Sequence, residues 1–371
     1  EIKPDDKELL AASREVDGHA LTLNLLGRFL ARAHSGDIRR RDLVKFEEAD
    51  RMEQGGTTFK MLAAFETWFA NSGEFGTRQL TVLGLIGLFD RPADAECLKA
   101  LRMAPPISGV TNALFLQTTR FWGLRTSYQP LSNEEWNHVM SFLSDFALVV
   151  RLNHGKCECI DCHPLVREFF TRRLQENCFS GWQMAHRRIY HYLLNTAPES
   201  TDAPLALLEQ QQRRQAPVLF GFQDDYKPPS GPSLDELMPV FQAVSHGCLA
   251  GCEGGALEQV YERRLLRWNE HYSSSILGAH ELTLHAASSF YGKPWHTLLP
   301  RIATAYVPWV LNETGFLLMA VNRLNEAIFP LQMARDIFRS INRWAKSAVV
   351  TTNMSECILA LGRIEEAIDL S

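Results

Sequence analysis

Hydrophobic positions recur along most of the chain with the spacing of an amphipathic α-helix. Leu9 and Val16 lie on one face of a predicted first helix, which Asp17-Gly18 ends before a second helix that runs to Ala33. The second helix is apolar on more than one face, so we expect it to be buried among neighbours. The same spacing predicts helices over residues 59–70, 77–89 and 133–144, a short helix that opens at Pro92-Ala93-Asp94, and loops around Pro105-Pro106 and Pro130.

One segment departs from the helical spacing. Residues 146–152 are almost continuously apolar, residues 153–156 have turn composition, and residues 157–161 follow as a predicted return strand. Helices followed by one β-hairpin are typical of a winged-helix domain. Pro164 then begins the next helix, at a position where the N–H that proline lacks is not needed.

An internal repeat marks the C-terminal part. Residues 322–328 align with residues 362–368, and the interval of 40 residues is typical of solenoids built from helix pairs. A weaker copy at residues 255–260, preceded by a helix over residues 239–249, does not keep this interval. We therefore expect an irregular first unit with an insertion around residues 291–300.

These patterns predict a mainly α fold: a helical bundle plus a winged-helix domain with one β-hairpin, followed by an irregular TPR-like α-solenoid. The predicted parts are a small helical domain (1–55), the winged-helix domain (56–178), a helical linker arm with a Pro-rich loop (179–233), and TPR-like repeats (234–371). Because the chain opens without methionine and the repeat is still running at Ser371, we expect a longer parent protein with upstream and further repeat segments.

The composition of the chain argues against several classes of function. The chain has 371 residues, of which 46% are hydrophobic and 22% charged, as in folded globular proteins. With 38 Lys and Arg against 43 Asp and Glu, a net charge of −5 creates no general attraction for nucleic acid. Apolar runs such as residues 80–89 are too short to span a membrane and no export signal opens the chain, which predicts a cytoplasmic protein with reduced cysteines.

Catalytic and metal motifs are largely missing. The chain has no G-x-x-x-x-G-K-[ST] phosphate loop, no G-x-S-x-G elbow and no H-E-x-x-H pair, so we expect no catalytic activity from these residues alone. Cys159-Ile160-Asp161-Cys162-His163 matches the short haem-attachment string, with Cys157 close by. Without an export route or a second paired spacing, thiols on a hairpin are favoured over haem or zinc.

Two short motifs, together with the order of parts, carry a resemblance to a known family. Residues 17–23 read Asp-Gly-His-Ala-Leu-Thr-Leu, and residues 162–170 read Cys-His-Pro-Leu-Val-Arg-Glu-Phe-Phe. The chain resembles STAND-class signalling NTPases of the NB-ARC and NACHT type. The first motif is similar to the family's G-L-P-L segment, with Gly18 and Leu21 matching and with His19 and Ala20 replacing leucine and proline. The second is similar to the winged-helix histidine motif.

The resemblance implies a nucleotide-dependent switch. His163, followed by Pro164, would approach the β-phosphate of ADP, and the segment with Gly18, Ala20 and Leu21 would pack near the adenine. ADP or ATP, with Mg²⁺, would be bound mainly by an upstream domain of an ATPase that carries a separate N-terminal effector. A protein trigger at the repeats would then favour an ATP-bound oligomer, as in bacterial antiphage defence or signalling. A histidine that simply caps the helix at Pro164 is the alternative from the residues alone.

The sequence is also compatible with two other functions. One is a winged-helix transcription regulator, although its recognition helix would be residues 133–144, where Glu134 and Glu135 oppose contact with DNA. The other is a TPR scaffold without nucleotide dependence. Four tryptophans of the repeat region could anchor a partner, but we expect most of them in the core: Trp268, Trp295, Trp309 and Trp344.

Overall fold

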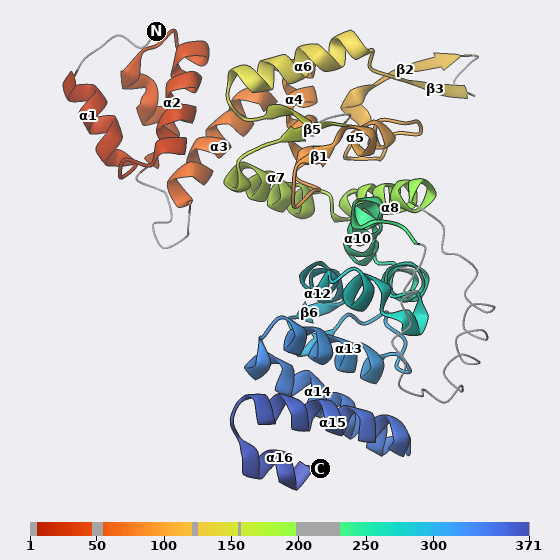
Figure 1. Ribbon diagram of the computed structural model, residues 1–371. Coiled ribbons are helices and arrows are strands. Elements are labelled where there is room, and N and C mark those ends of the chain that lie inside the picture. Colours follow the sequence, from red (N-terminus) through yellow and green to blue (C-terminus); the bar gives the residue numbers. More distant parts are fainter. Residues whose placement is uncertain (1–5, 47–54, 121–124, 155–156, 198–230, 371) are drawn as a thin grey trace. The chain divides into compact units, whose positions relative to one another are not determined.

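The computed structural model describes residues 6–46, 55–120, 125–154, 157–197 and 231–370. Helices dominate these residues, and the strands form only small antiparallel sheets (Figure 1), so the predicted mainly α class is confirmed. The chain divides into two compact units, Glu1–Arg188 and Ile189–Ser371. The four predicted domain boundaries stay a prediction, and most of the Pro-rich loop lies outside the described residues.

The first unit begins with three helical segments: α1 (Asp6–Glu15), α2 (Ala20–Ala33) and the 3-10 helix η1 (Ile38–Val44). Gly18, with a φ of 71°, ends α1, and its N–H donates to the Ser13 carbonyl at 2.8 Å. The buried guanidinium of Arg41 on η1 pairs with Glu8 at 2.7 Å and with Glu15 at 3.1 Å. These ion pairs fix η1 against α1.

A helical hairpin forms the centre of this unit: α3 (Gly56–Ala70) and α4 (Gly73–Ile86). Phe65 of α3 is fully buried and packs edge-on against Phe29 of α2, with ring centroids 5.1 Å apart, and against Phe146, at 5.5 Å. Because α3 contacts both α2 and α7 (Pro164–Asn177), it joins the first helices to the rest of the unit (Figure 1).

A three-stranded sheet has the strand order β1-β5-β4. Ala93 of β1 pairs with Ile160 of β5, and Leu152 of β4 pairs with Cys159. The elements that build and support this sheet are β1 (Ala93–Asp94), α5 (Ala95–Leu101), α6 (Asn133–Asp145), β4 (Val150–His154) and β5 (Cys157–Asp161). The return strand has the predicted bounds, and Asp94 caps α5 by accepting from Glu96 N at 2.9 Å.

Two predictions about strands in this unit were wrong. The strand expected over 146–152 begins only at Val150, because Ala147 has a φ of 56° and ends α6, with Leu148 N donating to the Leu143 carbonyl at 3.1 Å. The loop expected around Pro130 is a hairpin, β2 (Phe115–Arg120) and β3 (Arg125–Pro130), which follows the 3-10 helix η3 (Asn112–Leu114). The described residues therefore contain more than the one β-hairpin expected.

The second unit starts within α8 (Phe179–Thr196). The helix expected from Pro239 begins five residues earlier, at Leu234, because Ser233 and Glu236 form a capping box there. A short hairpin lies where the insertion was expected. The elements up to this hairpin are α10 (Leu234–Leu249), α11 (Glu253–Gly255), the π-helices η4 (Ala256–Leu265) and η6 (Tyr272–Ile276), η5 (Trp268–Glu270), α12 (His280–Ser288), β6 (Tyr291–Lys293) and β7 (Thr297–Leu298).

Four consecutive helices complete the unit: α13 (Val307–Ala320), α14 (Leu324–Ser340), α15 (Trp344–Ala360) and α16 (Ile364–Leu370). The turns between them contain Asn322, Asn342 and Gly362, which have φ values of 60°, 56° and 79° and follow one another at intervals of 20 residues. The 40-residue period thus contains two similar turns. Only the turns before α14 and α16 add an Arg–Glu ion pair, Arg323–Glu326 and Arg363–Glu366.

The tight approach of α3 and α4 gives a matched pair of glycine tests. A Cβ at Gly76 would overlap the carbonyl oxygen of Phe69, whereas a Cβ at Gly84 would meet only a methyl of Leu174 at 3.9 Å. We expect Gly76→Ala to lower the free energy of unfolding by about 1–3 kcal/mol through overpacking. We expect Gly84→Ala to raise it by about 0.5–1 kcal/mol, since alanine favours the helix. Urea unfolding of both variants measures the difference, and equal stabilities would contradict this packing.

Candidate functional site

His19 caps the start of α2. Its Nδ1 accepts a hydrogen bond from Thr22 N at 3.4 Å and lies 2.9 Å from Thr22 Oγ1. The backbone of His19 is extended, as an N-cap requires, and the side chain of Thr22 is fully buried. The imidazole of His19 is therefore exposed at the amino-terminal end of α2, and its Nδ1 edge is held against the helix.

His163 has the same role at the start of α7. Its Nδ1 accepts from Leu165 N at 3.2 Å, and Pro164 occupies the first helical position. The preceding backbone is held by Asp161, which accepts from Cys162 N at 2.8 Å and pairs with Arg167. The helix-cap role expected for His163 as an alternative is thus present in the structure.

The start of α3 connects the two histidine caps. Thr58 Oγ1 lies 2.8 Å from Thr22 Oγ1 and 3.3 Å from His19 Nδ1. Gly55 caps α3 without any side-chain hydrogen bond, at a φ of 87° that favours glycine. A Cβ at Gly55 would come within 2.8 Å of a Leu165 methyl group. The amino-terminal ends of α2, α3 and α7 therefore converge on one small region.

The convergence of the starts of α2, α3 and α7 determines the electrostatics around His19 and His163. Partial burial lowers the pKa of His163, and repulsion by the nearby imidazole of His19 lowers it further. In its neutral form His163 carries the proton on Nε2, because Nδ1 accepts a hydrogen bond. Each helix also presents the positive end of its dipole here. The region is thus suited to an anion, which backbone N–H groups and imidazole donors bind well.

The structure brings the two predicted motifs together through His19. Gly18 and Ala20 are exposed, Leu21 is half-buried, and Pro164 is exposed beside His163. Whether these residues bind a cofactor stays a prediction. Four residues of the region were not predicted as site residues, although the first two belong to the first motif: His19, Thr22, Gly55 and Thr58. The position of His19 before an apolar helix could have identified a cap, but no sequence signal places Thr58 against it.

Two cysteines near the β1-β5-β4 sheet, Cys97 and Cys162, are buried thiols, and Cys159 is half-buried. Burial raises the pKa of Cys97 to about 12 and that of Cys162 to about 11, which keeps both protonated at neutral pH. Across the described part of the chain, no group of three His, Cys, Asp or Glu side chains is placed to hold a metal ion.

Comparisons of the chain with family models, with curated proteins and with solved structures found no match. Within the described ranges, no helix combines the length and apolar character needed to cross a bilayer.

Removing His19 should raise the pKa of His163. The variant His19→Asn keeps a good N-cap and removes the charge that repels a protonated His163. NMR titration of the His163 ring in both proteins measures this shift. His138→Asn, at an exposed position of α6 beside Phe75, is the matched control and should leave the pKa unchanged. An unchanged pKa in His19→Asn would contradict the proximity of the two rings.

The lowered pKa of His163 makes the free energy of unfolding depend on pH. Because the native pKa of His163 is below the unfolded value, the unfolded chain binds more protons between the two. The contribution of His163 to stability is thus fully present above its ordinary pKa and is lost as pH falls through the native pKa. Urea unfolding at about pH 7.5 and about pH 5.5 should show a smaller loss in His163→Asn. An identical loss in both proteins would show that other groups cause it.

Proposed function

We propose that the chain is the regulatory and sensor portion of a STAND-class NTPase switch, which holds ADP in a closed resting state. On binding a trigger at its repeats, the protein would exchange ADP for ATP and oligomerise, in defence against phage or in related signalling. The single observation that carries the proposal is that the start of α3 contacts both segments that the family resemblance singled out, since Thr58 lies 3.3 Å from His19 and a Cβ at Gly55 would come within 2.8 Å of Leu165, beside His163. His19 and His163 lie 144 residues apart in sequence.

The first unit supports a winged-helix assignment within this proposal. Its elements follow in the order α4, β1, α5, α6, β4 and β5, and β5 lies between β1 and β4 in the sheet. The hairpin β2–β3 would be an insertion before α6. The first turn of α6 is acidic, with Glu134 and Glu135, and Glu135 pairs with Arg78 at 3.5 Å. This charge favours a contact within the protein over insertion into a DNA groove.

The groups at the converging helix ends fit a nucleotide phosphate. The amides of Thr22 and Leu165 already donate to the histidine Nδ1 atoms, so the neutral imidazoles can still donate from Nε2. The first amides of α3 have no side-chain cap. His163 and these amides would hold a phosphate, whose negative charge the helix ends stabilise. The remaining contacts to ADP or ATP and Mg²⁺ would come from an upstream domain.

The helices of the second unit support a TPR-like sensor. The turns at Asn322, Asn342 and Gly362 repeat the same left-handed conformation, so consecutive helices pack as antiparallel neighbours. Buried small residues recur at one position of these helices, with Ala327 and Ala367 both in the core. Stacked helix pairs of this kind expose long surfaces that bind protein partners. A protein trigger is therefore the partner class that we propose.

The proposal is tested by measuring nucleotide retained on the purified full-length parent protein. His163→Ala removes a donor to the phosphate, and loss of one hydrogen bond to a charged group costs about 1.5–3 kcal/mol. We therefore expect ADP affinity to fall by roughly ten- to hundred-fold. His138→Ala is the matched control on the same unit. Nucleotide content that is equal in both variants would favour the scaffold or regulator function instead.

A further inference from the structure

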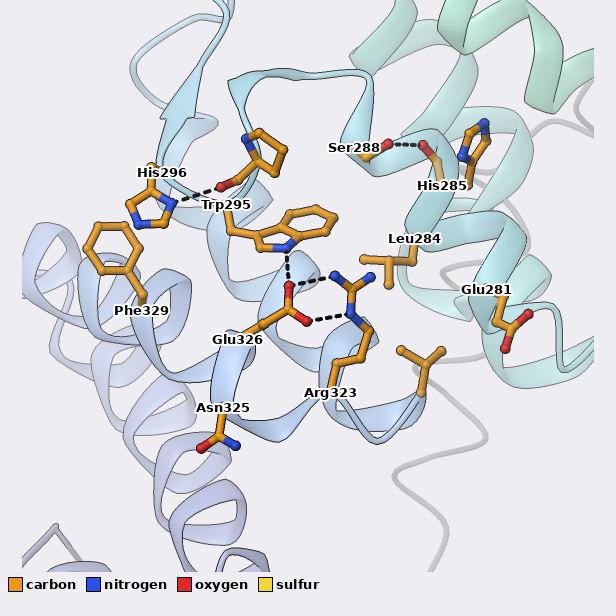
Figure 2. Close-up of a pocket in the computed structure, with 12 residues that line it drawn as sticks. Glu281, Leu284, His285, Ser288, Trp295, His296, Arg323, Asn325, Glu326 and Phe329 are labelled. Atoms are coloured by element: carbon orange, nitrogen blue, oxygen red, sulfur yellow. Dashed lines mark hydrogen bonds and ion pairs between the residues drawn. The ribbon is translucent and has the colours of Figure 1, made fainter. Parts of the chain in front are cut away.

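A pocket of about 870 Å³ lies in the second unit, between α12, the β6–β7 hairpin and the start of α14 (Figure 2). Its volume is in the range of sites that enclose a ligand or a short peptide segment. One side is formed by Leu284 and Glu281 of α12, and the other by Trp295, Glu326 and neighbouring side chains. All these elements belong to one compact unit.

Trp295 lies at the centre of the pocket in a strained conformation. Its φ of 62° is left-handed, which is an outlier for a bulky side chain. The indole is 7% exposed, packs edge-on against Tyr291 and donates from Nε1 to Glu326 Oε2 at 2.9 Å. Such strain persists only where surrounding contacts enforce it, and it is concentrated at functional sites. The hairpin thus directs one indole into the pocket.

The pocket has an excess of negative charge. Arg323 pairs with both oxygens of Glu326, from Nε at 2.7 Å and from Nη2 at 2.5 Å, and these bonds lower the pKa of Glu326. This cation and this anion therefore neutralise each other. Glu281 has no hydrogen bond or ion pair with any residue that the structure describes. With histidines counted as neutral, the lining carries one uncompensated negative charge.

The aromatic lining is suited to a cation on an apolar stem. His296 stacks on Phe329 with ring centroids 4.3 Å apart, and Phe329 remains 38% exposed. The guanidinium of Arg323 lies 5.5 Å from the Trp295 ring, so the indole already contacts one cation. Aromatic faces beside a carboxylate attract ammonium and guanidinium groups. Leu284 and Val321 add apolar walls that can contact methylene groups or a neighbouring apolar side chain.

We propose that this pocket binds an arginine or lysine side chain carried by a short peptide segment of a partner protein. Glu281 would pair with the cation, and the aromatic and apolar lining would contact its stem and flanking residues. The pocket would then be the place where the trigger protein is recognised. This role of the partner rests on the proposed function. An anionic segment is disfavoured, since it would have to displace Glu326 from Arg323.

Calorimetric titration of the full chain with three probes tests the pocket: acetyl-Leu-Arg-Leu-amide, the same peptide with glutamate in place of arginine, and free arginine amide. We expect the arginine peptide to bind, the glutamate peptide not to bind, and arginine amide to bind more weakly because it lacks apolar flanks. Added salt should weaken binding by screening the exposed carboxylate. Equal binding of the first two peptides, or no binding of either, would overturn the proposal.

Two variants separate the pocket from the rest of the surface. Glu281→Gln should weaken binding of the arginine peptide by roughly two- to five-fold, an effect of the size expected for one exposed ion pair. Glu365→Gln, at an exposed position of α16 outside the pocket, is the matched control and should bind as the native chain does. Phe329→Ala should weaken binding of the arginine peptide more than binding of arginine amide, because the phenyl ring would contact the leucines that flank the arginine. Binding unaffected by both Glu281→Gln and Phe329→Ala would place the peptide elsewhere.

These measurements do not depend on nucleotide. Weaker peptide binding in Glu281→Gln with unchanged ADP retention would support peptide binding at the pocket independently of the switch function. Conversely, normal ADP retention in His163→Ala would remove the switch function and leave the peptide measurement intact. The failure of one proposal is therefore distinguishable from the failure of the other.

Discussion

The need to satisfy the free N–H groups at helix starts determines how the candidate site is built. Every α-helix begins with amides that lack a partner within the helix, and a side-chain cap contributes about 1 kcal/mol. In α2 and α7 this cap is a histidine. The cap holds the Nδ1 edge of each imidazole against its helix and leaves the Nε2 edge directed away from it. The Thr22–Thr58 hydrogen bond then brings the start of α3 to the same region. Three positive helix ends and two imidazoles follow from that arrangement.

Helical periodicity predicted the element types well and their ends less well. The apolar run from Phe146 to Val149 suggested a strand, yet its residues end α6 and fill the core, because a left-handed residue at Ala147 turns the chain there. The polar strands β2 and β3 lack the apolar alternation on which strand prediction depends. In the candidate site, the resemblance of residues 17–23 and 162–170 to the family motifs pointed to Gly18 and His163, and their role in binding a cofactor stays a prediction. Thr58 was missed because only tertiary packing brings it to His19.

The second unit shows how a hairpin inserted between consecutive helices creates a pocket. Regular helix pairs bury their small residues against each other and leave shallow surfaces. Between α12 and α13 the β6–β7 hairpin interrupts this packing and places Trp295 beside Glu326. Most of the four tryptophans of this region were expected in the core, but of these four only Trp295 is buried, whereas Trp268 and Trp309 are half-buried and Trp344 is 63% exposed. The burial of Trp295 did not indicate its left-handed backbone or the pocket. The repeat pattern also concealed that its period consists of two similar turns.

A switch requires that the two units influence each other, and thermodynamics limits how they can do so. If a basic peptide in the second unit weakens retention of ADP by the first, then ADP must weaken binding of that peptide by the same factor. A peptide with equal affinity for the resting and active states would shift nothing, however tightly it bound. If the proposed switch operates, differential affinity for its two states, and not affinity alone, is therefore the property that its trigger must have.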